Sequence, residues 1–303
     1  MSAFRHRPYA EGVKPFAIGL RPIAPRDWIE ADERLAAELA LKEEIFAAEG
    51  EEAFAALPGG EAAQEMIAAA LAAHLPERFP DIYEADGEGI RVAGKRVSLR
   101  ADAPLKQAAR LVQEDLLLMQ RSDEGWRLTA GALCFPSTWR LGDKLGRPME
   151  AIHAPVPGFA GAMGDRIRRI FDHLPSGERV ERFNLSIYGD AELRHAVTRA
   201  PAEKFSEGRS ALALAHLRVE RQTLWKLAPG DILFTVRTYL DPLAHLARRP
   251  DGASLATALA AHLREMTPEQ RAYKGIEQGN ARLMAAIEEI ARDATTSPGS
   301  GRP

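Results

Sequence analysis

Two long stretches of alternating side chains constrain the fold of this sequence more than any other feature. In LALAHLRVERQTLWKL, Leu217 and Val219 fall on one side of an extended strand, and Arg218 and Glu220 fall on the other. DILFTVRTYL alternates in the same way, and a proline-glycine turn at 228–231 separates the two stretches. This pattern predicts a long antiparallel hairpin. ERFNLSIYG alternates too and predicts a further strand.

The rest of the chain favours helices around such a sheet. We expect a helix that is capped by Asp27 and runs to about Phe46, and a second helix over 61–74 that ends at Pro76. Further helices are expected over 104–120, 161–174, 254–266 and 268–292, and the last begins with a capping box at Thr267. We also expect a small hairpin at 89–102 and a strand within 126–136. Strands and helices follow one another without a regular β-α-β rhythm, so the pattern predicts an α+β fold. We expect one large domain over 1–294, with an N-terminal arm at 1–26 and a disordered tail at 295–303.

Composition excludes several kinds of protein. The 303 residues include one cysteine, which rules out a disulfide framework, a cysteine-built zinc site and a cysteine-held iron–sulfur cluster. The formal net charge of −3 provides no overall positive potential that would attract nucleic acid or an anionic membrane surface. No apolar run approaches the roughly 18 residues of a membrane span, and the first residues contain no secretory signal. We therefore expect a cytoplasmic protein with no nucleic-acid or membrane partner.

The irregular segment around 137–159 is the first candidate for a functional element, because long irregular segments in compact domains usually bind ligands or carry catalytic residues. Within it, His153 precedes two prolines that stiffen the chain. A rigid loop can hold an imidazole as an iron ligand or a catalytic base. The alternative is a histidine that only caps neighbouring backbone. Cys134, in an apolar strand, is expected to fill the core, with an iron thiolate as the less favoured alternative.

Polar residues within the long hairpin form the second candidate. Arg218, Glu220 and Gln222 share one side of their strand and can bind a carboxylate, and we expect Arg237 and Tyr239 to extend this polar surface. The alternative is a solvated sheet face with a cross-strand ion pair. The acidic run QEDLLLM lies within the expected helix at 104–120, where its polar residues 113–115 are expected to face solvent.

Four blocks then carry a family resemblance. QEDLLLM, the AGALCFPSTW to DKLGRPMEAIHAPVPG block, RVERQTLWKL and ILFTVRTYLDPL resemble, in this order, the family of haem-dependent oxidative N-demethylases. The resemblance covers roughly residues 15–290. One departure is Leu185, which stands where the family pattern has a tryptophan.

The resemblance implies a haem b bound in a PAS-like α+β fold. It also implies that O₂ is a co-substrate and that an N-methyl group is removed from a small secondary amine such as dimethylamine, with release of formaldehyde. Under it, His153 is the expected axial ligand of the iron, and Arg218, Arg221 and Arg237 are expected to bind the haem propionates. Glu220 is expected to orient an arginine or the substrate ammonium. Because one cysteine cannot hold an iron–sulfur cluster, a separate reductase or ferredoxin-type partner is expected to supply electrons. The alternatives are a PAS-like haem-binding sensor and a non-catalytic subunit.

Overall fold

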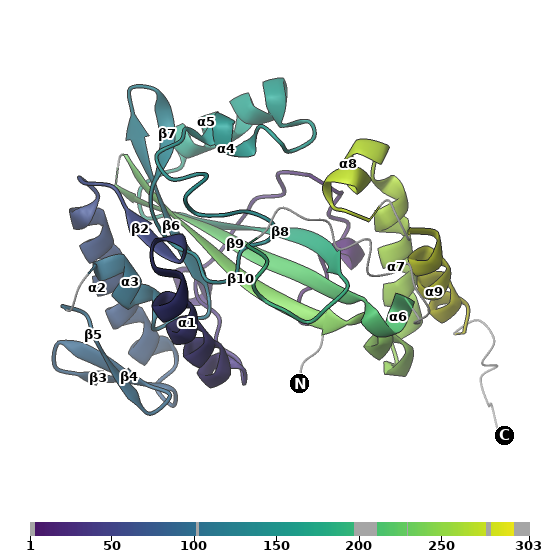
Figure 1. The fold of residues 1–303 in the computed structure, drawn as a ribbon, viewed down its shortest axis with the longest axis horizontal. Coiled ribbons are helices and arrows are strands. Elements are labelled where there is room, and N and C mark those ends of the chain that lie inside the picture. Colours follow the sequence, from purple (N-terminus) through teal and green to yellow (C-terminus); the bar gives the residue numbers. More distant parts are fainter. Residues whose placement is uncertain (1–3, 101–102, 197–210, 229, 277–279, 294–303) are drawn as a thin grey trace.

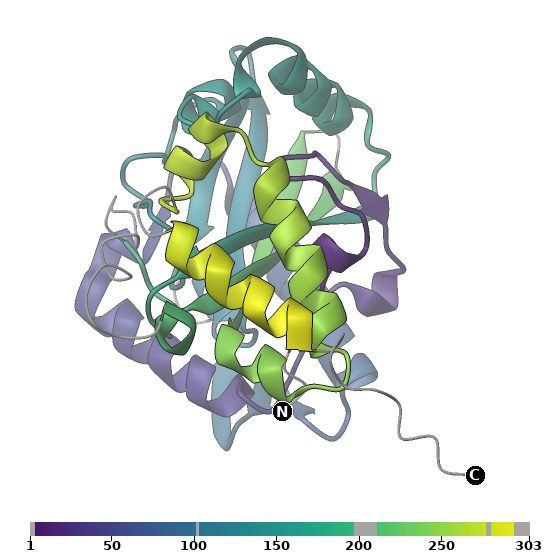
Figure 2. The same ribbon diagram turned by 90° about the vertical axis from the view of Figure 1, so that its right-hand side faces the viewer.

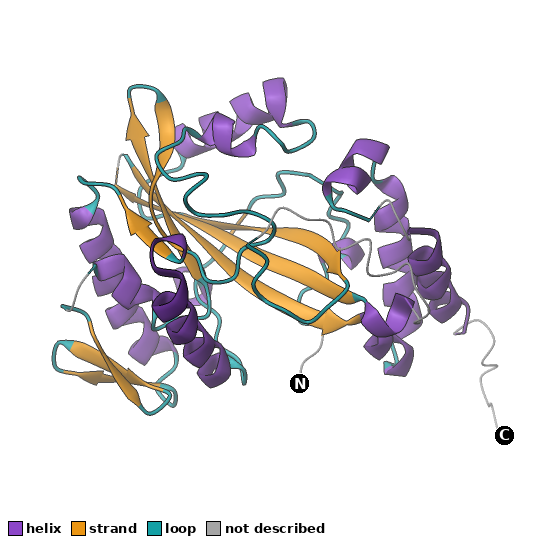
Figure 3. Cartoon of the chain, viewed as in Figure 1, coloured by secondary structure: helices purple, strands orange, loops and turns teal. Residues whose placement is uncertain are grey.

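A seven-stranded antiparallel sheet runs through the centre of the molecule (Figures 1 and 3). The computed structural model describes residues 4–100, 103–196, 211–228, 230–276 and 280–293. The strand order is β1-β8-β9-β10-β6-β7-β2. The strands are β1 (Arg21–Pro22), β2 (Phe54–Ala56), β6 (Asp115–Ser122), β7 (Gly125–Ala132), β8 (Arg179–Tyr188), β9 (His216–Ala228) and β10 (Asp231–Pro242).

The hairpin predicted from the alternating pattern is confirmed as β9 and β10. In its register, Glu220 lies opposite Thr238 and Arg221 lies opposite Arg237. Residues that face each other across an antiparallel pair project from the same side of the sheet. Even-numbered residues of β9 therefore share one face with even-numbered residues of β10, and odd-numbered residues share the other.

Different helices cover the two faces. One face, called here the α5 face, packs its apolar residues against α4 (Met149–His153), η4 (Phe159–Met163) and α5 (Gly164–His173), and α8 (Pro268–Tyr273) reaches it near β8. In Figure 1 these elements lie above the sheet. The other face, called here the α1 face, is covered at one end by α1 (Leu35–Glu49), α2 (Glu61–Arg78) and α3 (Pro104–Ala109).

The second end of the α1 face is covered by α6 (Ala211–Leu214), α7 (Gly252–Glu265) and α9 (Asn280–Asp293). Figure 2 shows α7 and α9 lying side by side over this end. The remaining elements are a small sheet of β3 (Tyr83–Asp86), β4 (Gly89–Val92) and β5 (Lys95–Ser98), and the short helical turns η1 (Pro8–Ala10), η2 (Pro25–Asp27), η3 (Gly50–Glu52) and η6 (Leu243–Arg248).

The predicted α+β class is confirmed: a large antiparallel sheet with surrounding helices forms one domain. The PAS-like likeness and the boundaries at 1–26 and 294 stay predictions, and the expected tail at 295–303 lies outside the described residues. In the part of the chain that the structure describes, no helix is long and apolar enough to cross a membrane.

The predicted helix over 104–120 is wrong beyond its first turns. α3 ends at Ala109, and the chain then enters β6 at Asp115. Leu116 packs on the α1 face and Leu117 on the α5 face, so the strand is buried on both sides. A continuous apolar run of this kind fits a buried strand as well as a helix, and its period cannot separate the two.

The acidic run at the start of β6 is buried rather than solvent-facing. Asp115 is 1% exposed, and its carboxylate accepts hydrogen bonds from the backbone N–H groups of Cys134 (2.7 Å) and Phe135 (2.9 Å). Gln113 and Glu114 are buried too and accept hydrogen bonds from the backbone N–H groups of Asp32 and Glu30. The expectation of solvent exposure therefore fails because these polar groups bond the backbone of neighbouring segments.

Three helix boundaries also differ from the predictions. α1 begins at Leu35, because residues 28–34 form an irregular segment of bends and turns on the α1 face, where the Trp28 carbonyl and the Asp32 carboxylate bind the sheet arginines. α2 continues through Pro76 to Arg78, with Leu75 fully buried. The capping box at Thr267 is confirmed, but α8 ends at Tyr273 and Gly275 follows with a φ of 65°, so the expected long helix is divided.

Candidate functional site

Six polar side chains share the α5 face of β8 and β9. They form three cross-strand pairs, Arg182 with Gln222, Asn184 with Glu220, and Ser186 with Arg218. The alternating sequence pattern places them together because every second residue of a strand projects from the same face. The polar surface predicted from Arg218, Glu220 and Gln222 is therefore present, and β8 extends it.

Glu220 lies at the centre of this surface and has three hydrogen-bond partners among the described residues. Its carboxylate accepts hydrogen bonds from Arg218 Nε (3.2 Å), Asn184 Nδ2 (3.1 Å) and Gln222 Nε2 (3.0 Å). Burial acts to raise the pKa of Glu220, but the charge of Arg218 and the hydrogen bond from Asn184 outweigh it and lower the pKa. Glu220 is therefore a buried carboxylate ion.

Arg218 is fixed on all sides. Its guanidinium donates to the carbonyl oxygens of Phe135 (2.6 Å) and Leu193 (2.8 Å) and to Thr238 Oγ1 (3.2 Å), in addition to Glu220. The side chain is 1% exposed. Arg218 therefore ties the end of β7 and the segment around Leu193 to the sheet.

Three further cations surround Glu220. Lys274, just after α8, donates to Asn184 Oδ1 (2.6 Å) and Ser186 Oγ (3.1 Å). Arg182 donates to the Ala17 carbonyl (3.2 Å), and its buried Nε has no partner among the described residues. Lys144 lies 4.2 Å from the centre of the Trp139 ring. Together with Arg218, these residues are called here the cation cluster.

Burial affects the protonation of the cation cluster. It lowers the pKa of Lys274 to about 8, and that of Lys144 to about 8, in both cases against the opposing charge of Glu220. It also lowers the pKa of Arg182. These shifts indicate cations that lack enough nearby negative charge.

His153 lies at the end of α4, in the irregular segment that covers the α5 face. Its Nδ1 bonds to the Met149 carbonyl at 2.9 Å, and its ring stacks on Phe159 with 4.7 Å between ring centres. Burial lowers the pKa of His153 to about 4, and the charges of Lys144 and Arg182 add to the shift. The imidazole is therefore neutral at pH 7.

The bond to Met149 also sets the tautomer of His153. A carbonyl oxygen can only accept, so Nδ1 carries the proton and Nε2 carries the lone pair. Among the described residues, Nε2 has no hydrogen-bond partner. A histidine whose Nδ1–H donates to a backbone carbonyl is arranged as metal-binding histidines commonly are.

Apolar residues of the same face lie beside the cation cluster. Phe159 and Leu224 are buried, whereas Phe234 and Val236 of the central strand β10 are only half-buried. Central-strand residues are usually covered completely, so this part of the α5 face leaves apolar surface available to a ligand.

The structure does not bring Arg221 and Arg237 into this site. Both project from the α1 face, where Arg221 binds Glu181 (2.6 Å) and the carbonyls of Trp28 (2.9 Å) and Asp27 (2.6 Å). Arg237 binds Asp32 and Glu38, each at 2.8 Å. The expectation that Arg237 and Tyr239 extend the polar surface of Arg218 is wrong, because the register puts them on the opposite face.

Cys134 fills the core, as expected. It is fully buried, and burial raises the pKa of its thiol to about 12. Among the described residues, no group of three or more histidine, cysteine, aspartate or glutamate side chains could hold a bare metal ion. A metal carried by its own organic ring needs only one protein ligand and is compatible with this finding.

Sequence reasoning missed Lys144, Arg182 and Lys274 as site residues. Arg182 had a detectable signal, because it alternates with Asn184 on a predicted strand. Lys144 lies in the irregular segment that was singled out, but nothing local marks it. Lys274 reaches the site only through the packing of α8, which no sequence period reveals.

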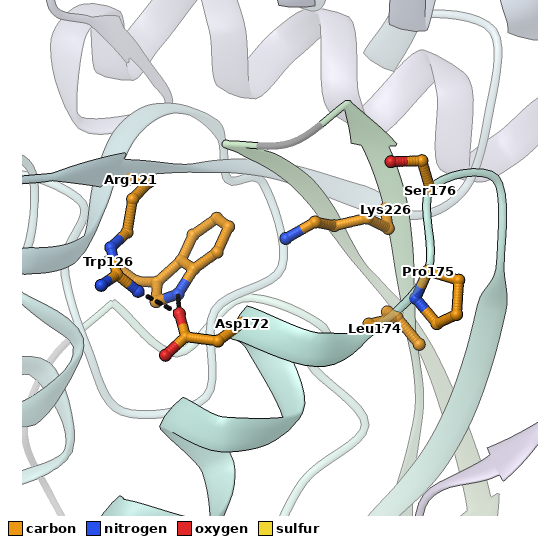
Figure 4. Close-up of a pocket in the computed structure, with 7 residues that line it drawn as sticks. All are labelled: Arg121, Trp126, Asp172, Leu174, Pro175, Ser176 and Lys226. Carbon is orange, nitrogen blue, oxygen red and sulfur yellow. Dashed lines mark hydrogen bonds and ion pairs between the residues drawn. The ribbon is translucent and has the colours of Figure 1, made fainter.

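A cavity of about 520 Å³ lies elsewhere, near the β9–β10 turn (Figure 4). Its charged groups have partners among the described residues: Asp172 accepts from Arg121 and from Trp126 Nε1 (2.8 Å), and Lys226 donates to the Phe171 carbonyl (2.8 Å). None of the predicted site residues lines it. A second cavity, of about 330 Å³, touches Arg221 on the α1 face.

Comparisons with known proteins bear on this site. A search of the curated proteins finds no match to this sequence. The sequence profile described as haem-dependent oxidative N-demethylase, alpha subunit-like, matches residues 19–284. The match includes the irregular segment, the polar surface of β8 and β9, and Lys274. The chain therefore belongs to the haem-dependent oxidative N-demethylase, alpha subunit-like family.

Proposed function

We propose that this protein is a haem-dependent monooxygenase that removes an N-methyl group from a small secondary amine such as dimethylamine and releases formaldehyde. The family assignment supports an oxidoreductase of this kind. The observation that carries the proposal is His153, a neutral imidazole whose Nε2 has no partner among the described residues.

The residues of the α5 face fit a haem b. His153 Nε2 is the axial ligand in this proposal, and the Met149 carbonyl holds the ring in the ligating tautomer. Phe234 and Val236 offer apolar surface to a flat macrocycle. The haem, once bound, supplies the site at which O₂, the co-substrate, is activated.

Glu220 and Arg218 have positioning roles in this proposal. Glu220 was expected to orient an arginine or a substrate ammonium, and its contact with Arg218 favours the first role. Its oxygens already accept three hydrogen bonds, so the carboxylate holds the polar surface in place. Arg221 and Arg237 are proposed to stabilise the α1 face rather than to contact haem propionates.

Electrons are proposed to come from a separate reductase or ferredoxin-type protein. The single cysteine is buried with a pKa raised to about 12 and cannot build an iron–sulfur cluster. A cytoplasmic location stays a prediction.

The first test is the absorption spectrum of the purified full chain, with and without added haemin. The proposal expects a Soret band that His153→Ala weakens or shifts and that added imidazole restores. His173→Ala is the matched control, because His173 also bonds a carbonyl one turn earlier on a helix but is exposed. A colourless protein that does not take up haemin overturns the proposal.

The second test separates catalysis from sensing. The haem-loaded protein is supplied with a chemical reductant, O₂ and dimethylamine, and formaldehyde is measured. Release that depends on all three supports the monooxygenase. A full complement of haem without formaldehyde favours the sensor or non-catalytic subunit instead.

A further inference from the structure

The charges around Glu220 are unbalanced. Asn184 bonds both Glu220 (3.1 Å) and Lys274 (2.6 Å), and Arg182 lies two residues from Asn184 on the same face of β8. The charge of Glu220 acts to raise the pKa of Lys144, Arg182 and Lys274. Within the described ranges, only Arg218 forms an ion pair with Glu220, at 3.2 Å. The cation cluster therefore holds four positive charges around one buried carboxylate, which already accepts three hydrogen bonds. The exposed carboxylate of Asp143 also acts on the pKa of Lys144.

The three remaining cations have unused bonding capacity. Among the described residues, the buried Nε of Arg182 has no partner, and the two hydrogen-bond acceptors of Lys274 are neutral oxygens. The ammonium of Lys144 makes no hydrogen bond to a described residue and rests against the face of Trp139. A half-buried cation without a carboxylate is unfavourable, because burial removes water without supplying a counter-charge.

The position of these cations narrows the choice of ligand. His153 stacks on Phe159, and Phe159 packs in the same apolar cluster as Trp139, the ring under Lys144. The proposed iron ligand and the cations therefore lie over one part of the α5 face. Half-buried Phe234 and Val236 lie on the same sheet face. A matching ligand has a flat apolar body for the half-buried side chains, a metal atom for His153, and carboxylates on its edge for the cations.

We propose that Lys144, Arg182 and Lys274 form a carboxylate-binding site that takes the two propionates of the haem held by His153. This inference rests on the proposed function. In this proposal the propionates contact Lys144, Arg182 and Lys274, whose donors are not all used by described residues, and not Arg221 and Arg237, which bind groups of the α1 face. The guanidinium of Arg182 suits a carboxylate fork, and the two lysines act as point charges.

The test compares haemin with haemin dimethyl ester, whose propionates are blocked. The full chain is stripped of haem and titrated with each compound in the same solvent, and affinity is read from the Soret band and from tryptophan quenching. Wild type is expected to bind the ester about tenfold or more weakly, since charge-assisted hydrogen bonds are lost. Equal affinity for both compounds overturns the propionate assignment while leaving haem binding intact.

Single variants then assign the effect to residues. Lys144→Met, Arg182→Met and Lys274→Met are each expected to bind haemin about tenfold more weakly, and to bind the ester as wild type does. Normal affinity for the ester shows that the variant is folded. Arg166→Met, on the exposed side of α5, is the control and is expected to bind both compounds normally. Equal losses for haemin and ester in all three variants overturn the proposal.

A last experiment distinguishes failure of the propionate assignment from failure of the proposed function. If the chain binds neither haemin nor ester, the proposed function and the propionate assignment both fail. Glutarate, a soluble dicarboxylate, then tests the cluster alone through the melting temperature. Stabilisation that the three variants lose supports a carboxylate site for another ligand, such as a carboxylated substrate, and no stabilisation overturns the site itself.

Discussion

Arg218 and Arg221 are both buried on β9, yet they project from opposite faces of the sheet. Arg218 belongs to the α5 face with Glu220, whereas Arg221 binds Glu181 and the backbone carbonyls of the N-terminal segment. The two arginines are therefore similar in burial and chemistry but have different roles. One face of the hairpin supports the candidate site, and the other supports the packing of the N-terminal segment.

Replacing Arg237 with methionine should destabilise the protein without weakening haem binding. The change removes the buried cation that Asp32 and Glu38 share and leaves them only the half-buried Arg34, at 3.3 and 3.5 Å among the described residues. Breaking a buried pair in this way costs up to about 3–5 kcal/mol. Urea denaturation measures the loss, and haemin titration of the folded variant should match wild type within about twofold. Weakened haem binding at normal stability would contradict the assignment of Arg237 to the α1 face.

Stability should fall in acid through Glu30. Burial acts to raise its pKa, but the hydrogen bond from His6 and the charges of His6 and Arg221 lower it to about 2. A carboxyl group with a depressed pKa stabilises the fold fully above its unfolded value of 4.5, and this stabilisation is lost as the pH falls through about 2. The shift corresponds to about 3 kcal/mol.

Urea denaturation of wild type and Glu30→Gln at pH 6 and pH 2.5 measures this contribution. Wild type should lose more stability than the variant across the interval, because the variant has no carboxyl group at this position to protonate. Parallel losses in the two proteins would show that Glu30 is not responsible.

The thiol of Cys134 should be inert in the folded protein. Its pKa of about 12 leaves only about one thiolate in 10⁴ at pH 8, and the side chain is fully buried. An aromatic disulfide reagent should report no reactive thiol in the native protein and one per chain in urea. Rapid reaction under native conditions would be incompatible with this environment.

Replacing Lys42 with methionine should be among the most damaging single changes away from the site. Its buried ammonium donates to the carbonyls of Ala109 (3.1 Å), Val112 (2.9 Å) and Glu114 (2.5 Å), which join α3 to β6. Losing one donor group leaves three carbonyls unsatisfied, at a cost of about 3 kcal/mol or more. Lys95→Met, on exposed β5, is the control and should change stability by less than about 0.5 kcal/mol.

Sequence reasoning was most reliable where a local pattern decides the structure. The alternation in β9 and β10 predicted the hairpin and placed Arg218 and Glu220 on one face. It failed at β6, because a run of leucines buried on both sides has no period that separates strand from helix. The same alternation puts Arg221 on the face opposite to Arg218, but the face of Arg237 depends on the register of the hairpin, which the alternation does not fix. The expectation of a shared cofactor role came from the resemblance.

The other omissions have a common physical cause. Lys274 acts on residues of β8 that lie about ninety positions earlier in the chain, and Arg221 bonds a carbonyl 193 positions away. Such contacts depend on how helices and loops pack over the sheet, so local propensity contains no information about them. Homologous sequence blocks identified the family, but only the folded chain separated the arginines by face.

The N-terminal segment touches both faces of the sheet. Ala17 accepts a hydrogen bond from Arg182 on the α5 face, and Trp28 accepts one from Arg221 on the α1 face. The two anchors lie on neighbouring strands and on opposite faces, so the segment can hold both together only in the assembled β8–β9 pair, and we expect it to dock after that pair forms. The candidate cofactor site would then be completed as one of the final assembly events, which makes ligand uptake a natural reporter of finished folding.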